Sequence, residues 1–104
     1  MKIEKDVHIT IPEEIRTYLR KLTITPEEWI NKECKKYKGY KLRPIPNYKR
    51  VDIHIILQPH TLEALQKIKV EGYSNKIIHL YYDMKRRQEK EERRRKIYNT
   101  LFKK

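Results

Sequence analysis

Residues 6–11 read DVHITI and residues 52–57 read DIHIIL, so a chain of 104 residues contains nearly the same six-residue stretch twice. Both stretches alternate apolar and polar side chains, which is typical of a β-strand with one buried face. A strand this short is not stable alone, so we expect the two copies to pair as a two-stranded ribbon. Its apolar face would consist of Val7, Ile9, Ile11, Val51, Ile53, Ile55 and Leu57.

A helical segment is expected after each strand. Pro12 and two glutamates open the first, because Pro fits a first helical turn and acidic residues interact favourably with the helix dipole there. Gln58-Pro59 open the second. Apolar residues then recur every three or four positions, which indicates one buried helix face. These residues are Ile15, Tyr18, Leu19 and Leu22 in the first copy, and Leu62, Leu65 and Ile68 in the second.

A turn and a second helix are expected in each half. Thr25 and Glu28 have the spacing of a capping box, with Pro26 at the first helical position. In the second half, Gly72 is expected to close one helix and Ser74 to cap the next. Each half is therefore predicted to run strand, helix, turn, helix.

The half Val51–Lys85 resembles the ribbon-helix-helix family of DNA-binding regulators, the Arc and MetJ type. The resemblance rests on the alternating strand, the Leu62-x-x-Leu65-x-x-Ile68 face and the element Gly72-Tyr73-Ser74-Asn75-Lys76-Ile77-Ile78. The half Lys5–Tyr37 resembles the family more loosely, since its turn is shorter and lacks the glycine. The whole chain is similar to the tandem ribbon-helix-helix transcription regulators of archaeal filamentous viruses.

This resemblance implies an α+β fold in which one chain forms the ribbon that the family normally builds from two chains. We expect a single-chain pseudo-dimer with a two-stranded antiparallel ribbon and four helices, the last one long. The alternative is a plain α+β scaffold that binds no nucleic acid. Within a single domain 1–104, the expected parts are a degenerate first copy (1–37), a basic linker (38–50), a second copy (51–85) and a charged C-terminal helical extension (86–104).

The composition favours an anionic partner. The net charge is +12, and charged residues make up 38% of the chain. An excess of this size points to an anionic polymer or surface. The abundant Lys, Arg and Glu also resemble the composition of proteins from hot habitats.

No apolar run approaches the roughly 18 residues needed to cross a bilayer, so no membrane association is expected. One cysteine, Cys34, fits a reducing interior, and we expect the cytoplasm, that of the host cell if the protein is viral.

Enzymatic and metal-binding functions are not expected. The two glycines exclude a Gly-rich phosphate loop, and neither Ser74 nor Cys34 lies in a recognisable nucleophile–base arrangement. The four histidines and Cys34 contain no pair at metal-ligand spacing, so neither a metal nor another cofactor is predicted.

The polar face of the ribbon is the predicted base-reading surface. A two-stranded ribbon fits the major groove, where His can donate to guanine, Asp can accept from a cytosine amino group, and an apolar side chain can touch a thymine methyl. Acidic residues at these positions depart from the family, which more often uses basic, amide or Thr side chains. Solvated outer-face positions are the alternative. The predicted base contacts are Asp6, His8, Thr10, Asp52, His54 and Ile56.

Phosphate contacts are predicted at the strand ends and at one helix start. Helix N-termini offer free amides and a positive dipole end to a phosphate. The second copy suits this role better, because Glu27 and Glu28 stand at the equivalent helix start of the first copy. The linker, with seven basic residues in 35–50, is either solvated or a basic strap along the DNA backbone. The predicted phosphate contacts are Lys2, Lys5, Lys49, Arg50, Ser74, Asn75 and Lys76.

The C-terminal region is predicted to be one long helix that leaves the body. Residues 85–96 read KRRQEKEERRRK, with opposite charges at i,i+4 spacing and no apolar side chain. A frayed, disordered end is the alternative. We expect a short apolar stripe beyond this segment to bind a second copy. The stripe consists of Ile97, Tyr98, Leu101 and Phe102.

These features predict a sequence-specific regulator of transcription that binds double-stranded DNA and assembles as a homo-oligomer. Two alternatives stay open. One is an architectural DNA-coating protein of low sequence preference, which the acidic ribbon positions favour. The other is an antitoxin-like protein-interaction module, although 85–96 lacks the continuous apolar face such a helix would need.

Overall fold

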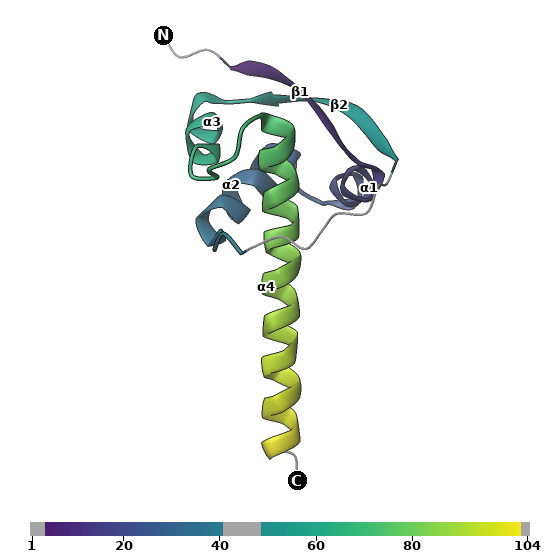
Figure 1. Cartoon of the computed structure of the whole chain (residues 1–104), viewed down its shortest axis with the longest axis vertical. Coiled ribbons are helices and arrows are strands. Elements are labelled where there is room, and N and C mark those ends of the chain that lie inside the picture. Colours follow the sequence, from purple (N-terminus) through teal and green to yellow (C-terminus); the bar gives the residue numbers. More distant parts are fainter. Residues whose placement is uncertain (1–3, 41–48, 103–104) are drawn as a thin grey trace.

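The computed structural model of the chain describes residues 4–40 and 49–102, and its helices all lie on one side of a two-stranded ribbon (Figure 1). The α+β fold predicted from the sequence, with an antiparallel ribbon and four helices, the last one long, is confirmed. In chain order the elements are β1 (Lys5–Pro12), α1 (Glu13–Lys21), α2 (Pro26–Lys36), β2 (Arg50–Leu57), α3 (Pro59–Leu65) and α4 (Tyr73–Phe102).

The register of the ribbon matches the sequence repeat. β1 and β2 pair antiparallel, with His8 opposite His54 at the middle and Pro12 opposite Arg50 at one end. His8 and His54 are also the equivalent positions of the two repeated stretches. The repeat and the strand pairing therefore share one local two-fold centre, which lies at the two histidines.

The inner face of the ribbon forms one wall of the core. Ile11 is fully buried, and every second residue of β1 from Val7 onward is covered by the helices. Val51 and Ile53 are only half-buried, so burial of the apolar face is less complete in the first half of β2 than in β1. The predicted alternation is confirmed in both strands.

The two halves of the chain are intertwined. The second helix of each half packs on the strand of the other half: α2 contacts β2, and α4 contacts β1. Helix α2 also packs against α3. Because of this exchange neither half encloses its own apolar face, and the core is shared. Its largest fully buried side chains on the second helices are Trp29, Ile30, Ile77, Ile78, Leu80 and Tyr81.

The start of α2 follows the sequence prediction, whereas the start of α4 does not. The Thr25 hydroxyl accepts a hydrogen bond from the backbone N–H of Glu28 at 3.1 Å. In the other half, α4 begins at Tyr73, and the carbonyl of Gly72 accepts from the N–H of Lys76 at 3.1 Å. Gly72 therefore precedes the helix as its cap, at a φ of +84° that favours glycine. The prediction that Ser74 caps α4 was wrong.

Helix α3 is also shorter than the sequence predicted. It ends at Leu65, and the backbone N–H groups of Gln66, Lys67 and Ile68 bond three residues back instead of four. These tighter turns end the helix well before Gly72, so Gly72 does not close it. Ile68 lies outside α3 but is completely buried, since the turn directs it into the core.

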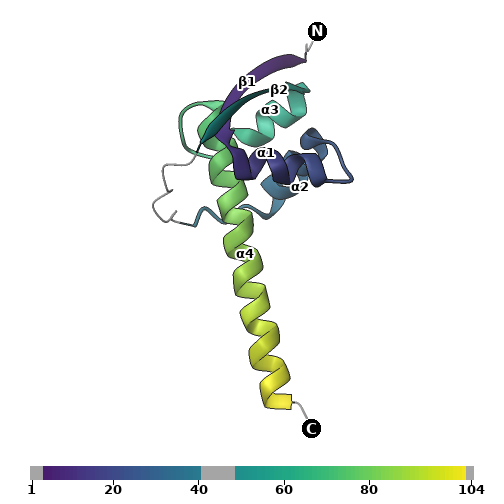
Figure 2. The same ribbon diagram turned by 90° about the vertical axis from the view of Figure 1, so that its right-hand side faces the viewer.

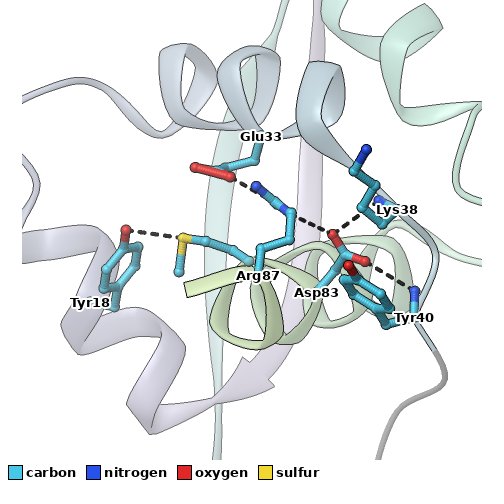
Figure 3. Close-up of polar contacts among 7 residues, drawn as sticks. Tyr18, Glu33, Lys38, Tyr40, Asp83 and Arg87 are labelled. Carbon is cyan, nitrogen blue, oxygen red and sulfur yellow. Dashed lines mark hydrogen bonds and ion pairs between the residues drawn. The ribbon is translucent and has the colours of Figure 1, made fainter. Parts of the chain in front are cut away.

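A buried ionic cluster holds α4 against α2 and against the segment that follows α2 (Figure 3). The Arg87 guanidinium lies 2.9 Å from a Glu33 oxygen on α2 and donates from Nε to Asp83 at 2.8 Å. Asp83 also accepts from the backbone N–H groups of Lys38 and Tyr40, at 3.2 and 3.1 Å. Asp83 is only 1% exposed, and a buried carboxylate requires such compensation.

Beyond this cluster, α4 continues as an exposed extension (Figures 1 and 2). The helix has 30 residues, about 45 Å at the usual rise, and the described side chains from Gln88 onward are exposed. The Lys90 ammonium lies 4.3 Å from the centre of the Tyr40 ring. This contact joins α4 to the start of the linker, in addition to the hydrogen bonds of Asp83. Linker residues 41–48 lie outside the described residues. None of the described helices combines the length and apolarity needed to span a bilayer.

Replacing Arg87 by Met should lower the free energy of unfolding by about 3 kcal/mol, because it leaves two buried carboxylates without their cation. The matched control is Arg95→Met, which removes an i,i+4 pair with Glu91 of similar length, 3.0 Å, on the exposed extension. That change should cost less than about 0.5 kcal/mol. Denaturant unfolding of both variants measures the difference, and equal effects would contradict the role assigned to the cluster.

Candidate nucleic-acid interface

The outer face of the ribbon is a continuous exposed surface that no described helix covers (Figures 1 and 2). Strand alternation directs every second side chain of β1 and β2 to this face. All six residues that the sequence singled out for base contact are exposed there: Asp6, His8, Thr10, Asp52, His54 and Ile56. The ribbon is about 26 Å long at the usual rise per residue.

The two histidines form the centre of this face. The rings of His8 and His54 stack with their centroids 3.7 Å apart and their planes inclined by 35°. The Nδ1 atom of His54 lies 3.4 Å from Oδ1 of Asp6. The stack places two imidazole rings, each with nitrogens that can form hydrogen bonds, side by side at the middle of the ribbon.

The two acidic side chains have different partners. Asp6 lies beside His54, whereas Asp52 accepts a hydrogen bond of 2.5 Å from the Thr10 hydroxyl. Both contacts run across the strands, so they depend on the register. Each uses one carboxylate oxygen, which leaves the other oxygen able to accept from a ligand. The acids are therefore part of an ordered polar surface.

Ile56 is the apolar member of this surface. Its side chain is 58% exposed and lies opposite Asp6 in the register. Thr10, the equivalent position in the other half of the repeat, carries a hydroxyl instead. A single exposed isoleucine is ordinary on a protein surface, but here it stands on a face that is otherwise polar.

Cations flank the ribbon at both ends. Lys5 begins β1, with its ammonium 5.1 Å from the centre of the Tyr73 ring. Arg50 begins β2 and is exposed; its position in the alternation puts it on the same face as Asp52. Lys49 is exposed, and its carbonyl accepts from the first N–H of α1, on Glu13, at 3.1 Å. Lys2 lies outside the described residues.

The start of α4 lies beside β1, but all three side chains predicted to hold a phosphate make hydrogen bonds within the protein. The Ser74 hydroxyl accepts from the backbone N–H of Thr10 at 2.9 Å. The Lys76 ammonium donates to the carbonyls of Leu65 and Ile68, at 3.3 and 2.6 Å. Lys76 thus adds a charged donor to two carbonyls that also accept from the backbone N–H groups of Ile68 and Val70. Asn75 is exposed, and its side chain donates to the carbonyl of Glu71 at 3.0 Å.

At the start of α4, the backbone N–H groups are what can still bind an anion. The first N–H groups of a helix have no partner within the helix, and the dipole there is positive. At the start of α2, by contrast, a Glu27 carboxylate oxygen accepts from the backbone N–H of Gln58 at 2.5 Å. This carboxylate ties α2 to the end of β2 and opposes an anion. The acidic start of α2 is present as expected, and phosphate binding at the start of α4 stays a prediction.

The histidines, acidic residues and Cys34 are the residue types that can act as metal ligands or nucleophiles. Residues 4–40 and 49–102 hold no group of three or more His, Cys, Asp and Glu side chains that could bind a metal. Cys34 is buried in the core, and its burial raises the pKa of the thiol to about 11. A thiol with so high a pKa stays protonated at neutral pH and is a poor nucleophile.

Sequence reasoning missed the interactions that position the interface. Ser74 on α4 and Glu27 on α2 each accept a hydrogen bond from the backbone of the ribbon or of the residue that follows it. The i,i+4 spacing of Asp83 and Arg87 was a visible signal for one part of the buried cluster. Nothing local indicated Glu33 as the third member, because it comes from another helix.

Replacing Lys76 by Met should lower the free energy of unfolding by about 1–2 kcal/mol, since it removes a charged donor from two carbonyls and keeps the apolar stem. Lys69→Met is the control, because Lys69 is exposed on the same connection and should change stability by less than about 0.5 kcal/mol. Urea unfolding gives both values. If Lys76→Met leaves stability unchanged but weakens DNA binding, Lys76 contacts a phosphate, as the sequence predicted.

The ribbon face, its flanking cations and the start of α4 thus form the candidate interface. Comparison of the chain with protein-family models, with curated proteins and with solved structures finds no match.

Proposed function

We propose that this protein is a sequence-specific regulator of transcription that binds double-stranded DNA by inserting the β1–β2 ribbon in the major groove. The observation that carries the proposal is the exposed outer face of the ribbon, with hydrogen-bonding side chains at its centre and cations at its ends. A two-stranded ribbon fits a groove about 12 Å wide, where the four base pairs present different patterns of donors and acceptors.

The charge of the chain supports a DNA partner. The net charge of +12 favours association with a polyanion, and phosphate neutralisation supplies much of the affinity in such complexes. In the proposed complex Lys5, Lys49 and Arg50 contact phosphates at the two ends of the ribbon, and Lys2 is assigned the same role. The backbone amides at the start of α4 hold a further phosphate, with Asn75 beside them.

Base reading is assigned to the outer face. The histidines can donate to guanine N7 or O6, and the free oxygen of Asp52 can accept from a cytosine amino group. The methyl groups of Ile56 can contact a thymine methyl. Occupancy of a promoter in this manner would block or recruit the polymerase.

We also propose that the fold is a tandem ribbon-helix-helix, a pseudo-dimer formed by one chain. Three features support this assignment: the repeated order of strand, helix and helix, the two-fold register centred on His8 and His54, and the packing of each second helix on the opposite strand. The resemblance to the tandem regulators of archaeal filamentous viruses favours a location inside a host cell.

An architectural DNA-coating protein of low sequence preference is the second candidate. The observation that favours it is the pair of carboxylates, Asp6 and Asp52, on the face that would read bases. A coating protein would depend on phosphates and would tolerate carboxylates that make no base contact. The two candidates differ in a measurable quantity, the spread of affinities among duplexes of different sequence at one salt concentration.

Duplex binding should weaken about 10³-fold between 50 and 200 mM salt if roughly six phosphates are neutralised. Replacing Arg50 by Ala should reduce the slope of log affinity against log salt by about one unit, because one phosphate contact is lost. Arg94→Ala removes the same charge from the exposed extension of α4 and should leave the slope unchanged. Fluorescence anisotropy across a salt series provides these values.

Binding that is absent at low salt, or unaffected by salt, would refute the DNA proposal. If Arg50→Ala and Arg94→Ala reduce the salt slope equally, the charge contact with DNA is diffuse and is not localised at the ribbon ends. Equal affinity for all duplexes would support the coating protein over the regulator.

The end of α4 is assigned to self-association with a second copy. Ile97, Tyr98 and Leu101 are 61%, 62% and 71% exposed on one stripe of the helix, at the end of a charged extension. The side chain of Phe102, at the last position of α4, lies outside the described residues. Because the helix is continuous from Tyr73, the stripe cannot fold back on its own core, and a neighbouring copy offers the matching apolar surface.

Deleting residues 97–104 should abolish dimerisation and cooperative DNA binding but leave single-site affinity nearly intact, because the ribbon is far from the end of α4. Sedimentation of both forms, with and without long DNA, measures this. Lys85→Ala, on the same helix but before the stripe, is a control that should still associate. A parent protein that stays monomeric and binds long DNA without cooperativity would refute the assignment.

A further inference from the structure

The two halves of the ribbon face are not chemically equivalent, although the backbone register is two-fold symmetric. The symmetry centre lies at His8 and His54, and each half of the face then presents one cross-strand pair. One pair is Asp6 with Ile56, and the other is Thr10 with Asp52. If the ribbon binds DNA as proposed above, this difference determines the kind of DNA site that the face fits.

In the first pair the acid is not bonded to its cross-strand neighbour. The side chain of Ile56 has no polar atom, and the Asp6 carboxylate instead lies 3.4 Å from Nδ1 of His54, beside the symmetry centre. The carboxylate is thus drawn towards the middle of the ribbon. The 58% exposed side chain of Ile56 gives this half an apolar contact surface beside the exposed Asp6 carboxylate.

In the second pair the acid is fixed by its neighbour. The Thr10 hydroxyl donates to Oδ1 of Asp52 at 2.5 Å, and the backbone N–H of Thr10 donates in turn to Ser74 on α4. Asp52 is therefore held by a β1 residue whose own backbone is tied to α4. Its second carboxylate oxygen is available as an acceptor, so the character of this half is polar and acidic.

We infer that the ribbon recognises a DNA site with two unequal half-sites, one read by the apolar Ile56 and the other by the Thr10–Asp52 pair. The half facing Ile56 would present a thymine methyl in the major groove. The half facing Asp52 would present an amino group, as cytosine does. A ribbon built from two identical chains faces a palindromic site, whereas this chain breaks the symmetry beside the central histidines, at the equivalent positions Thr10 and Ile56.

The same difference orients the protein on the DNA. Because the two half-sites cannot be exchanged without loss, the chain binds in one direction, and the extension of α4 has a defined orientation relative to the promoter. The two reading positions are four residues apart along each strand, about 13 Å, which places both within one major-groove segment.

Selection of bound duplexes from a random pool tests the inference directly. The parent protein should select a non-palindromic site with thymine in one half-site. Ile56→Thr gives both halves a hydroxyl and should shift the selected site towards two equal halves. Thr10→Ile gives both halves an apolar side chain and should add a thymine to the half-site that lacked it. All the changed side chains are exposed, so the variants keep the core intact.

Removing single methyl groups tests the contact itself. Uracil in place of the selected thymine should weaken binding of the parent about fourfold, because burial of one methyl group is lost. Binding of Ile56→Ala should be nearly insensitive to the same replacement. Uracil at thymines outside the half-site is the control and should have no effect on either protein.

The outcomes separate this inference from the function on which it rests. If the parent binds no duplex at low salt, the proposed function fails and the inference fails with it. If the parent selects a palindrome with equal halves, or if Ile56→Thr leaves the selected site unchanged, the protein is a DNA-binding protein and only the inference is overturned. If no sequence is enriched although DNA is bound, the coating protein is supported and the inference is again overturned.

Discussion

The pairing of β1 with β2 is the constraint on which the rest of the structure depends. Two strands of eight residues are not stable by themselves, and their apolar faces must be covered. The helices that cover them are exchanged between the halves, with α2 on β2 and α4 on β1. The ribbon therefore forms only as part of one shared core, and its outer face stays open because every helix is needed on the inner side.

The open face owes its order to contacts across the strands. His8 and His54 stack at the centre, while Asp6 and Asp52 contact different partners on either side. The Thr10 hydroxyl is neutral, so it fixes the position of the Asp52 carboxylate without cancelling its charge. Phosphate contacts are therefore assigned to the cations at the ends of the ribbon.

The position of α4 is set by charge as well as by apolar packing. Asp83, Arg87 and Glu33 bring α2, α4 and the residues after α2 to one buried point, where the helix leaves the body. Past that point opposite charges at i,i+4 spacing, such as Glu91 with Arg95, support the helix without a core. The extension is thus anchored at its base and solvated along its length, which suits contacts with a neighbouring molecule.

The sequence by itself determined the elements and their exposed faces, because these depend on local periodicity. Alternation in 6–11 and 52–57 specified the strands, the spacing of Thr25 and Glu28 specified a helix start, and the charge pattern of 85–96 indicated a continuous helix. The same patterns did not indicate the partners of Lys76: a phosphate was predicted, but its ammonium donates to the carbonyls of Leu65 and Ile68.

Only the tertiary structure decided which side chains meet. The sequence pattern predicts Ser74 as a helix cap, but Gly72 takes that place and Ser74 bonds Thr10, a residue 64 positions away in the chain. The contrast between the Asp6–His54 and Thr10–Asp52 contacts likewise comes from the register of two distant strands. Local patterns specify helices, strands and their faces, whereas contacts between distant residues depend on how those faces pack. That is why the candidate surface was visible in the sequence and its internal order was not.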